Sequence, residues 1–261
     1  MSASSYMKGS DSMAKQGKED KLLHELEHVK INASDNEFIG KLMDDTLKKK
    51  HKIWLSSDWH LYKRIKKGVS TCNKRPGFSK LMKALHRSVK DGDLLIFLGD
   101  LVDGEMKASL TLQNEIKANL SDIPNKIMLR GNNDLFDKEF YEKDCGFLRC
   151  CDGFVWKNIL FTHCPQRNTE KYDMNIHGHI HASKCYWIPY VNHIDVCAFD
   201  GRDKPIELYW LMKQIKRYQK QITEDPSHFE EGYCIQPTQL DLFNIIMNDE
   251  YIPFIRDPFE D

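Results

Sequence analysis

The stretch Ile53–His60, with the sequence IWLSSDWH, decides how the central part of this chain folds. It begins as a short apolar run, which predicts a buried strand, and it ends with Asp58 and His60 two positions apart. Residues i and i+2 of a strand point to the same side, so we expect the carboxylate and the imidazole to converge on one ion. A carboxylate oxygen and an imidazole nitrogen suit Mn²⁺, Fe or Zn²⁺.

Four further apolar segments are each expected to form a strand, and each is followed by polar side chains that can bind a metal ion, as Ile53–Ser56 is followed by Asp58 and His60. The candidate ligands behind these segments are Asp100, Asn132, His163, His179 and His181. Strands that alternate with helices predict a mostly parallel inner sheet, and the ligands of such folds gather at the carboxyl ends of the strands. We therefore expect all seven side chains to meet at one edge of this sheet.

The seven groups are two carboxylates, one amide and four imidazoles, which is too large a set for one ion and suits two. Asp100 follows a central strand and is the natural bridge between the ions. Gly99, Gly131 and Gly178 precede three of the ligands, where we expect positive φ angles and close backbone approach. Each polar group alone is equally well explained as a cap on a strand end, but five such ends together favour a metal centre.

A dinuclear centre favours one type of chemistry. Two metal ions about 3.5–4 Å apart clamp the attacking and leaving oxygens of an in-line displacement, and a hydroxide that bridges them is the nucleophile. The ions meet the charge that develops on the phosphoryl oxygens, so the protein needs no covalent intermediate. The sequence therefore favours the hydrolysis of phosphate esters.

The composition restricts the class of protein. The chain has 261 residues, of which 41% are hydrophobic, and a formal net charge of -1, which indicates a globular fold without a general attraction to nucleic acid or membranes. None of its 8 cysteines forms a C-x-x-C pair, and the start of the chain is polar and charged, without the pattern of a signal peptide. We expect reduced thiols in a cytoplasmic protein, with no membrane span.

Five motifs together resemble the sequence blocks of the calcineurin-like metallophosphoesterase superfamily. They are Asp58-Trp-His60, Gly99-Asp100-Leu-Val-Asp103, Gly131-Asn132-Asn133-Asp134, Thr162-His163 and Gly178-His179-Ile-His181. The resemblance covers roughly the central half of the chain. It implies an α/β fold, a two-sheet α/β sandwich with flanking helices, and a dinuclear metal centre. The helical pattern of apolar residues between positions 18 and 50 adds an N-terminal helical extension.

The resemblance also implies which residues hold each ion. Asp58, His60 and His181 would hold the first ion, Asp100 would bridge, and Asn132, His163 and His179 would hold the second. The two divalent ions would be Mn²⁺, with Fe, Zn²⁺ or Ni²⁺ as alternatives. Cys164 follows His163 directly, and we interpret it as a small buried residue because thiolate ligands are unusual in this superfamily.

Asn133 and Asp134 are the candidate catalytic residues, and Asn133 departs from the superfamily pattern. Many members have a histidine at this position, which assists the phosphate or protonates the leaving group. An amide can donate a hydrogen bond to a phosphoryl oxygen but is no general acid at pH 7. We expect Asn133→His to raise monoester turnover relative to diester turnover. Asp134 would orient the residue at 133 or serve a structural role.

Local signals and the resemblance together divide the chain. A break at residues 32–35 lets Ser34 or Asp35 cap a helix, and Pro205 is expected to open a helix to about Ile222. The expected parts are an N-terminal extension, partly disordered then helical (residues 1–50), the metallophosphoesterase domain (51–223), and a C-terminal tail packed on the domain (224–261).

The predicted function is a metal-dependent phosphoesterase, with a phosphodiesterase slightly preferred over a monoesterase. The expected partner is a phosphate-ester substrate such as a nucleotide. A nuclease is the first alternative, in which the basic loop at residues 63–67 would contact DNA or RNA, although the net charge of -1 disfavours it. The second alternative is a scaffold that keeps the fold without catalysis. The oligomeric state is not predicted.

Overall fold

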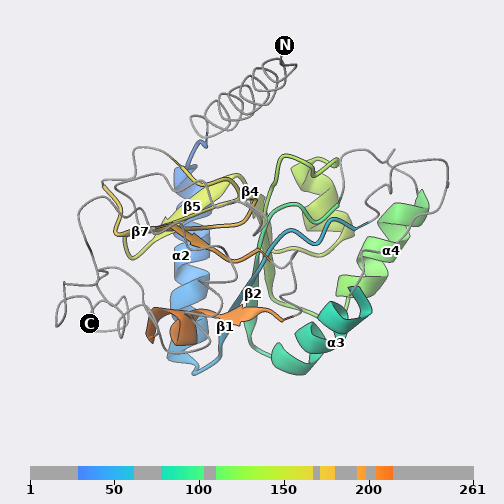
Figure 1. The fold of residues 1–261 in the computed structure, drawn as a ribbon, viewed down its shortest axis with the longest axis horizontal. Helices are drawn as coiled ribbons and strands as arrows, with labels where there is room; N and C mark the ends of the chain where they lie inside the picture. Colours follow the sequence, from blue (N-terminus) through green and yellow to red (C-terminus); the bar gives the residue numbers. More distant parts are fainter. Residues whose placement is uncertain are drawn as a thin grey trace, which may run out of the picture.

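Two sheets and the helices around them form the part of the chain that the structure describes (Figure 1). This computed structural model describes residues 29–61, 78–102, 110–166, 171–179, 193–197 and 204–213. The predicted α/β class and the two-sheet arrangement with flanking helices are confirmed.

The first sheet has five described strands in the order β4-β3-β2-β1-β9. Strands β1 to β4 run parallel, whereas β9 pairs with β1 in the antiparallel direction. The central strand β2 is buried at every position, which explains its uninterrupted apolar sequence LLIFL. The strands are β1 (Ile53–Ser56), β2 (Leu94–Leu98), β3 (Lys126–Leu129), β4 (Arg149–Cys151) and β9 (Ile206–Glu207).

The second sheet has four described strands in the order β5-β6-β7-β8. Strands β5 and β6 form a hairpin whose two turn residues, Lys157 and Asn158, have φ angles of 46° and 63°. Positive φ at both positions matches the twist of the flanking strands. Strands β6, β7 and β8 are parallel. The strands are β5 (Gly153–Trp156), β6 (Ile159–Thr162), β7 (Met174–His177) and β8 (His193–Asp195).

Alternate residues of the first sheet supply two separate cores. In β2, Leu94, Ile96 and Leu98 belong to the core that contains the second sheet, whereas Leu95 and Phe97 pack with the helices on the other face. This alternation follows from the two-residue period of a strand. Figure 1 shows α3 and α4 on the side of the first sheet away from β5 and β7. The helices on this face are α3 (Phe78–Ser88), α4 (Leu110–Leu120) and the π-helix η1 (Phe140–Asp144).

Helix α2 (Ala33–Lys48) packs against β5 and also contacts β1 and β4. Its Ile39 and Met43 are fully buried in the core that the two sheets share. The side chain of Asn32 caps the helix by accepting hydrogen bonds from the backbone N–H groups of Ser34 and Asp35. The expected cap at Ser34 or Asp35 was therefore wrong, because the helix begins early enough for Asn32 to reach its first free N–H groups.

The region after Pro205 differs from the sequence-based prediction. Ile206 and Glu207 form β9, and residues 208–213 are helical. The predicted start of the helix was wrong because the edge of β1 offers backbone hydrogen bonds to these two residues. The rest of that helix and the tail at residues 224–261 lie outside the described residues. Among the described helices, none is long and apolar enough to cross a membrane.

Candidate metal centre

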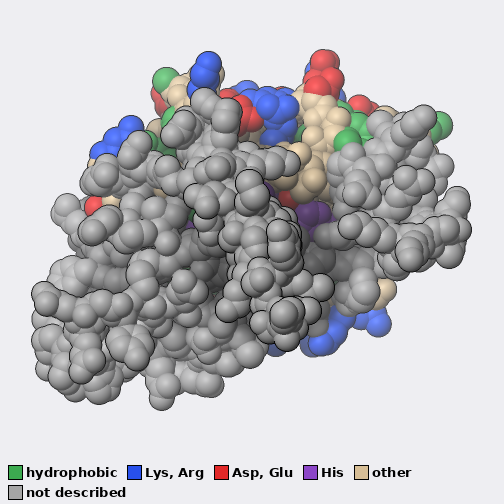
Figure 2. Space-filling view, turned by 45° about the horizontal axis from the view of Figure 1, so that its top comes forward, with side chains coloured by type: hydrophobic (Ala, Val, Ile, Leu, Met, Phe, Trp, Pro, Cys, Tyr) green, Lys and Arg blue, Asp and Glu red, His purple; other side chains and the backbone are tan. Residues whose placement is uncertain are grey.

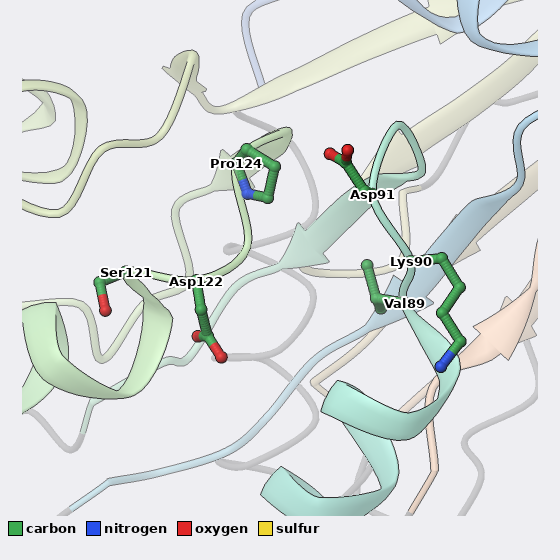
Figure 3. A pocket seen from close by; sticks show the side chains of 6 residues that line it. All are labelled: Val89, Lys90, Asp91, Ser121, Asp122 and Pro124. Carbon is green, nitrogen blue, oxygen red and sulfur yellow. The ribbon is translucent and has the colours of Figure 1, made fainter.

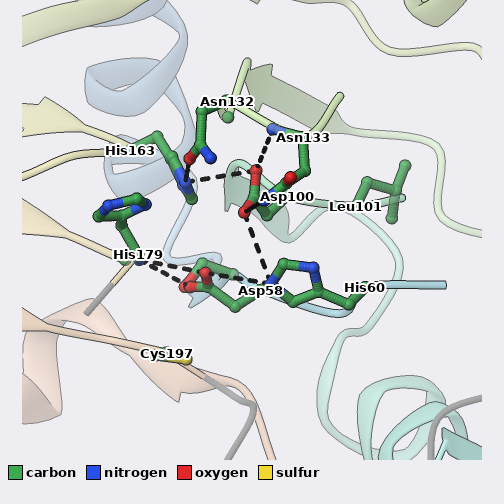
Figure 4. A network of polar contacts seen from close by, with 12 residues as sticks. Asp58, His60, Asp100, Leu101, Asn132, Asn133, His163, His179 and Cys197 are labelled. Atoms are coloured by element: carbon green, nitrogen blue, oxygen red, sulfur yellow. Dashed lines mark hydrogen bonds and ion pairs between the residues drawn. The ribbon is translucent and has the colours of Figure 1, made fainter. Parts of the chain in front are cut away.

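The candidate ligands that the structure describes lie where the carboxyl ends of both sheets meet (Figure 4). Asp58, Asp100 and Asn132 follow strands of the first sheet, whereas His163 and His179 follow strands of the second. A backbone bridge between Ser57 and Cys197 joins the sheets at this end. The expectation of a single sheet edge was therefore wrong. The sequence shows that a strand ends at each ligand but does not show which strands pair.

Four of the candidate ligands have backbone conformations that side chains rarely adopt. The φ angles are 56° at Asp58, 43° at His60, 56° at Asp100 and 74° at His179. Such conformations cost on the order of 1–3 kcal/mol each outside glycine and persist where the surrounding structure holds them. Backbone hydrogen bonds hold two of them here, from the N–H of Asp58 to Gly99 O at 2.9 Å and from the N–H of His60 to Asp100 O at 3.0 Å.

Asp100 lies between two histidines. Its Oδ2 is 3.5 Å from Nε2 of His60, and its Oδ1 is 3.3 Å from Nε2 of His163. Asp100 is 1% exposed and both imidazoles are buried, so water does not screen these charges. The charge and hydrogen bond of His163 lower the pKa of Asp100 despite its burial. The arrangement has the form that a bridging carboxylate requires.

His163 is oriented by a backbone carbonyl and faces further oxygens. Its Nδ1 donates to Leu98 O at 2.7 Å, and its Nε2 lies 3.0 Å from Asn132 Oδ1 and 3.3 Å from Asp100 Oδ1. Burial opposes protonation, but the charge of Asp100 raises the pKa of His163 to about 9. Since both atoms that face Nε2 are oxygens, Nε2 requires either a proton or a cation between it and them. The donor set therefore fits a divalent metal ion.

Asp58 connects the two sheets through its carboxylate. Both of its oxygens accept a hydrogen bond from the backbone N–H of His179, at 3.1 and 3.0 Å, and the Ser57 hydroxyl donates to Oδ2. Oδ1 lies 3.8 Å from Nε2 of His60. The His179 ring is edge-on to the ring of His163, with centroids 5.1 Å apart. Three of these residues, Asp58, Asp100 and His163, present ligand atoms within 4.8 Å of one another.

Asn133 and Asp134 both act on the Asp100 segment. Asn133 donates to the Asp100 carboxylate from its backbone N–H at 2.9 Å and from its side-chain Nδ2 at 2.6 Å. Asp134 accepts hydrogen bonds from the backbone N–H groups of Asp100, Gly131 and Leu101, at 3.0, 2.7 and 3.0 Å. Burial and the charge of Asp100 raise the pKa of Asp134 to about 7, and the hydrogen bond from Gly131 opposes this shift. Asp134 thus braces the loop that carries Asp100.

The family of the chain follows from the match of its sequence to a family model. The model of the calcineurin-like phosphoesterases matches residues 51–208, which include every candidate ligand. The chain belongs to the calcineurin-like phosphoesterase family. Members of this family act on phosphate esters and generally use a dinuclear metal centre.

Three proteins that resemble this calcineurin-like phosphoesterase share less than a third of its residues over the matched parts. An uncharacterized protein of Methanocaldococcus jannaschii is 29% identical over 185 residues, which are 64% of this chain and 92% of that protein. A protein of unknown function from Aquifex aeolicus has 21% identity and a TM-score of 0.45, over 63% of this chain and all of that one. A nuclease from Pseudomonas putida has 18% identity and a TM-score of 0.34, over 51% of this chain and 62% of the nuclease chain.

Two glycines of this phosphoesterase leave space for ligand carboxylates. A Cβ on Gly131 would lie 2.0 Å from Asp100 Oδ1, and one on Gly178 would lie 2.4 Å from Asp58 Oδ2. The expected close approach therefore occurs at both. The expected positive φ occurs only at Gly99, at 89°, because the left-handed turns elsewhere fall on the ligands themselves.

Cys164 and Ser57 lie beside the candidate ligands, although neither was predicted as a site residue. Ligand atoms of His163, Cys164 and His179 lie within 4.8 Å of one another, and Cys164 is 9% exposed. The position of Cys164 directly after His163 was the only sequence signal that it lies near the centre. Cys164 was interpreted as a small buried residue because thiolate ligands are unusual in this superfamily. For Ser57, the only sequence signal of a contact with the site was its position directly before Asp58.

The remaining predicted site residues lie outside the described part of the chain. These are His181 and the basic loop at residues 63–67. In the space-filling view of Figure 2, histidine and acidic atoms are visible beside each other. A separate hollow of about 360 Å³ (Figure 3) lies between the end of α3 and the end of α4, and hence at the amino ends of β2 and β3. It is lined by Val89, Lys90, Asp91, Ser121, Asp122 and Pro124.

Proposed function

We propose that this chain is a metal-dependent phosphoesterase that hydrolyses phosphate esters, with phosphodiesters preferred over monoesters. The observation that carries the proposal is the position of Asp100 between Nε2 of His60 and Nε2 of His163, at 3.5 and 3.3 Å. One carboxylate with an imidazole on each side is the donor arrangement of a pair of ions.

Each of the two ions would be held by its own set of ligands, and one carboxylate would contact both. Asp58 and His60 would hold one ion, Asn132, His163 and His179 the other, and Asp100 would contact both; His181 completes the predicted set. When bound, two divalent ions such as Mn²⁺ supply an ionised water and neutralise charge on the phosphoryl oxygens. Leu98 O keeps the Nδ1 proton of His163 in place, so that Nε2 presents its lone pair to the centre.

The preference for diesters is proposed from Asn133. Many members of the family have a histidine at this position, and an amide that faces Asp100 cannot act as a general acid at neutral pH. Without this histidine, we expect weak monoester turnover. Support for the preference is therefore chemical, and the ratio of the two activities is the quantity to measure.

The test is the hydrolysis of an aryl phosphodiester and of the matching monoester by metal-stripped protein refilled with Mn²⁺. We expect turnover that depends on the metal, and a loss of at least about 10²-fold in Asp100→Asn, because the neutral amide bridges two cations poorly. Asp45→Asn, an exposed change in α2, is the control and should keep full activity. Equal turnover in Asp100→Asn would contradict a dinuclear mechanism. Metal binding without turnover on any ester would favour a scaffold.

A further inference from the structure

A single residue holds both oxygens of the Asp100 carboxylate. Asn133 donates to Oδ1 from its backbone N–H at 2.9 Å and to Oδ2 from its side-chain Nδ2 at 2.6 Å. Asp100 is 1% exposed, so water does not compete for these hydrogen bonds. Two donors on two oxygens prevent the carboxylate from rotating about its last side-chain bond.

The remaining acceptor directions of the same oxygens face the two histidines. An ionised carboxylate has about four acceptor directions, two on each oxygen. Asn133 occupies one direction on each, while Nε2 of His60 lies 3.5 Å from Oδ2 and Nε2 of His163 lies 3.3 Å from Oδ1. Each oxygen therefore retains one direction toward one histidine. Figure 4 shows the contacts of Asp100 with His60, His163 and Asn133 as dashed lines.

We infer that Asn133 is a positioning residue, which holds Asp100 in the orientation that bridges two metal ions, and that it does not contact the leaving group. The inference rests on the proposed function, since it assigns a role within the same centre. A carboxylate that is ordered before the ions arrive loses no rotational freedom when they bind. The side-chain amide donates to Asp100, which turns it toward the carboxylate.

The first test compares the binding of Mn²⁺ to the metal-stripped full-length chain, by isothermal titration calorimetry, in the wild type and two variants. Asn133→Ala removes the side-chain donor but keeps the backbone donor, and we expect its affinity for Mn²⁺ to fall by about 10–100-fold. Asn125→Ala is the matched control, because Asn125 precedes the other end of β3, and its affinity should equal that of the wild type. Wild-type affinity in Asn133→Ala would overturn the inference.

Activity at increasing Mn²⁺ concentration separates positioning from a general loss of structure. Saturating Mn²⁺ should restore most of the turnover of Asn133→Ala, because the lost orientation is regained when the ions bind. Turnover that stays low at full metal occupancy would overturn the positioning role. The thermal unfolding midpoint of the metal-stripped variant, compared with that of Asn125→Ala, reports any change in the fold itself.

Asn133→His distinguishes the positioning role from a role at the leaving group. We expect weaker Mn²⁺ binding, since an imidazole does not reproduce the amide's contact with Asp100. We also expect an unchanged ratio of monoester to diester turnover, which replaces the rise expected from the sequence alone, because residue 133 faces Asp100. Unchanged affinity together with a raised ratio would overturn the inference. A wild-type chain that binds no Mn²⁺ would contradict the proposed function as well, whereas a wild type that binds two ions isolates the question of Asn133.

Discussion

At the scale of single residues, the ligand loops of this phosphoesterase leave space only for a hydrogen atom at certain positions. Gly131 precedes Asn132, and a Cβ on it would lie 2.0 Å from Asp100 Oδ1 and 2.4 Å from Asp100 N. Asp100 is held by Asn133 and Asp134, so neither of these atoms can withdraw without breaking hydrogen bonds. The chemistry of the ligands therefore depends on a residue that carries no functional group.

Gly131→Ala is expected to abolish Mn²⁺-dependent turnover and to weaken Mn²⁺ binding by at least about 10-fold, because it displaces a bridging ligand. Calorimetric titration with Mn²⁺ measures the affinity. Gly40→Ala in α2 is the matched control, since a Cβ there would lie 3.9 Å from the nearest atom. The control should bind normally and be more stable by roughly 0.5–1 kcal/mol, as expected of alanine in a helix. Normal metal binding by Gly131→Ala would show that the Asp100 loop can move.

At the scale of elements, the hydrogen bonds of Asp93 connect the amino end of β1 with that of β2. Its carboxylate accepts hydrogen bonds from the backbone N–H groups of Lys52 at 2.8 Å and Lys90 at 3.0 Å, and from Trp54 Nε1 at 2.9 Å. These bonds lower the pKa of Asp93 although burial opposes the shift. This end of the strands is opposite to the candidate metal centre, so the residue tests stability separately from chemistry.

Asp93→Asn should lower the free energy of unfolding by about 1–3 kcal/mol at pH 7, since an amide presents a donor where the structure offers only donors. Because the folded state lowers the pKa of Asp93, the stabilisation is present above about pH 4 and is lost as the pH falls through the lowered pKa. Urea unfolding of both proteins between pH 3 and pH 7 should show the difference shrinking at acidic pH. A difference that stays constant with pH would contradict the role of the charge. Metal affinity at pH 7 should not change.

At the scale of the whole molecule, the candidate metal centre joins the two sheets. The N–H of His179, after β7, donates to Asp58, after β1, and His163, after β6, donates to Leu98 at the end of β2. Metal ions held by ligands from both sheets would add further connections across the same junction. Metal binding should therefore stabilise the entire fold rather than one loop.

Metal loading is expected to raise the thermal unfolding midpoint, with a gain of about 2.7 kcal/mol when free Mn²⁺ is 100 times its Kd. Differential scanning calorimetry of stripped and reloaded protein measures the effect. His163→Ala should lose most of the gain, because it removes the ligand that faces both Asp100 and Asn132. Binding of Mn²⁺ by the wild type without any rise in the midpoint would show that the ions also bind the unfolded chain or a mobile segment.

Much of the architecture could be predicted from the sequence, and two features that were missed depend on how the elements pack. The strands before Asp58, Asp100 and His163 were each marked by an apolar run that ends in a polar group. The pairing of β9 with β1 left no such mark, because two residues carry no periodicity. The cap at Asn32 was missed because cap position depends on where the packed helix begins.

The sequence by itself determined the family, the strand ends and the types of donor that follow them, because all of these are local patterns. Only the tertiary structure decided that the candidate ligands come from two sheets, since strand pairing depends on contacts between distant segments. It also decided that Asn133 turns toward Asp100, a contact across 33 positions. A side chain bonds to whichever partner the packed backbone brings within reach, and the local sequence does not specify that partner.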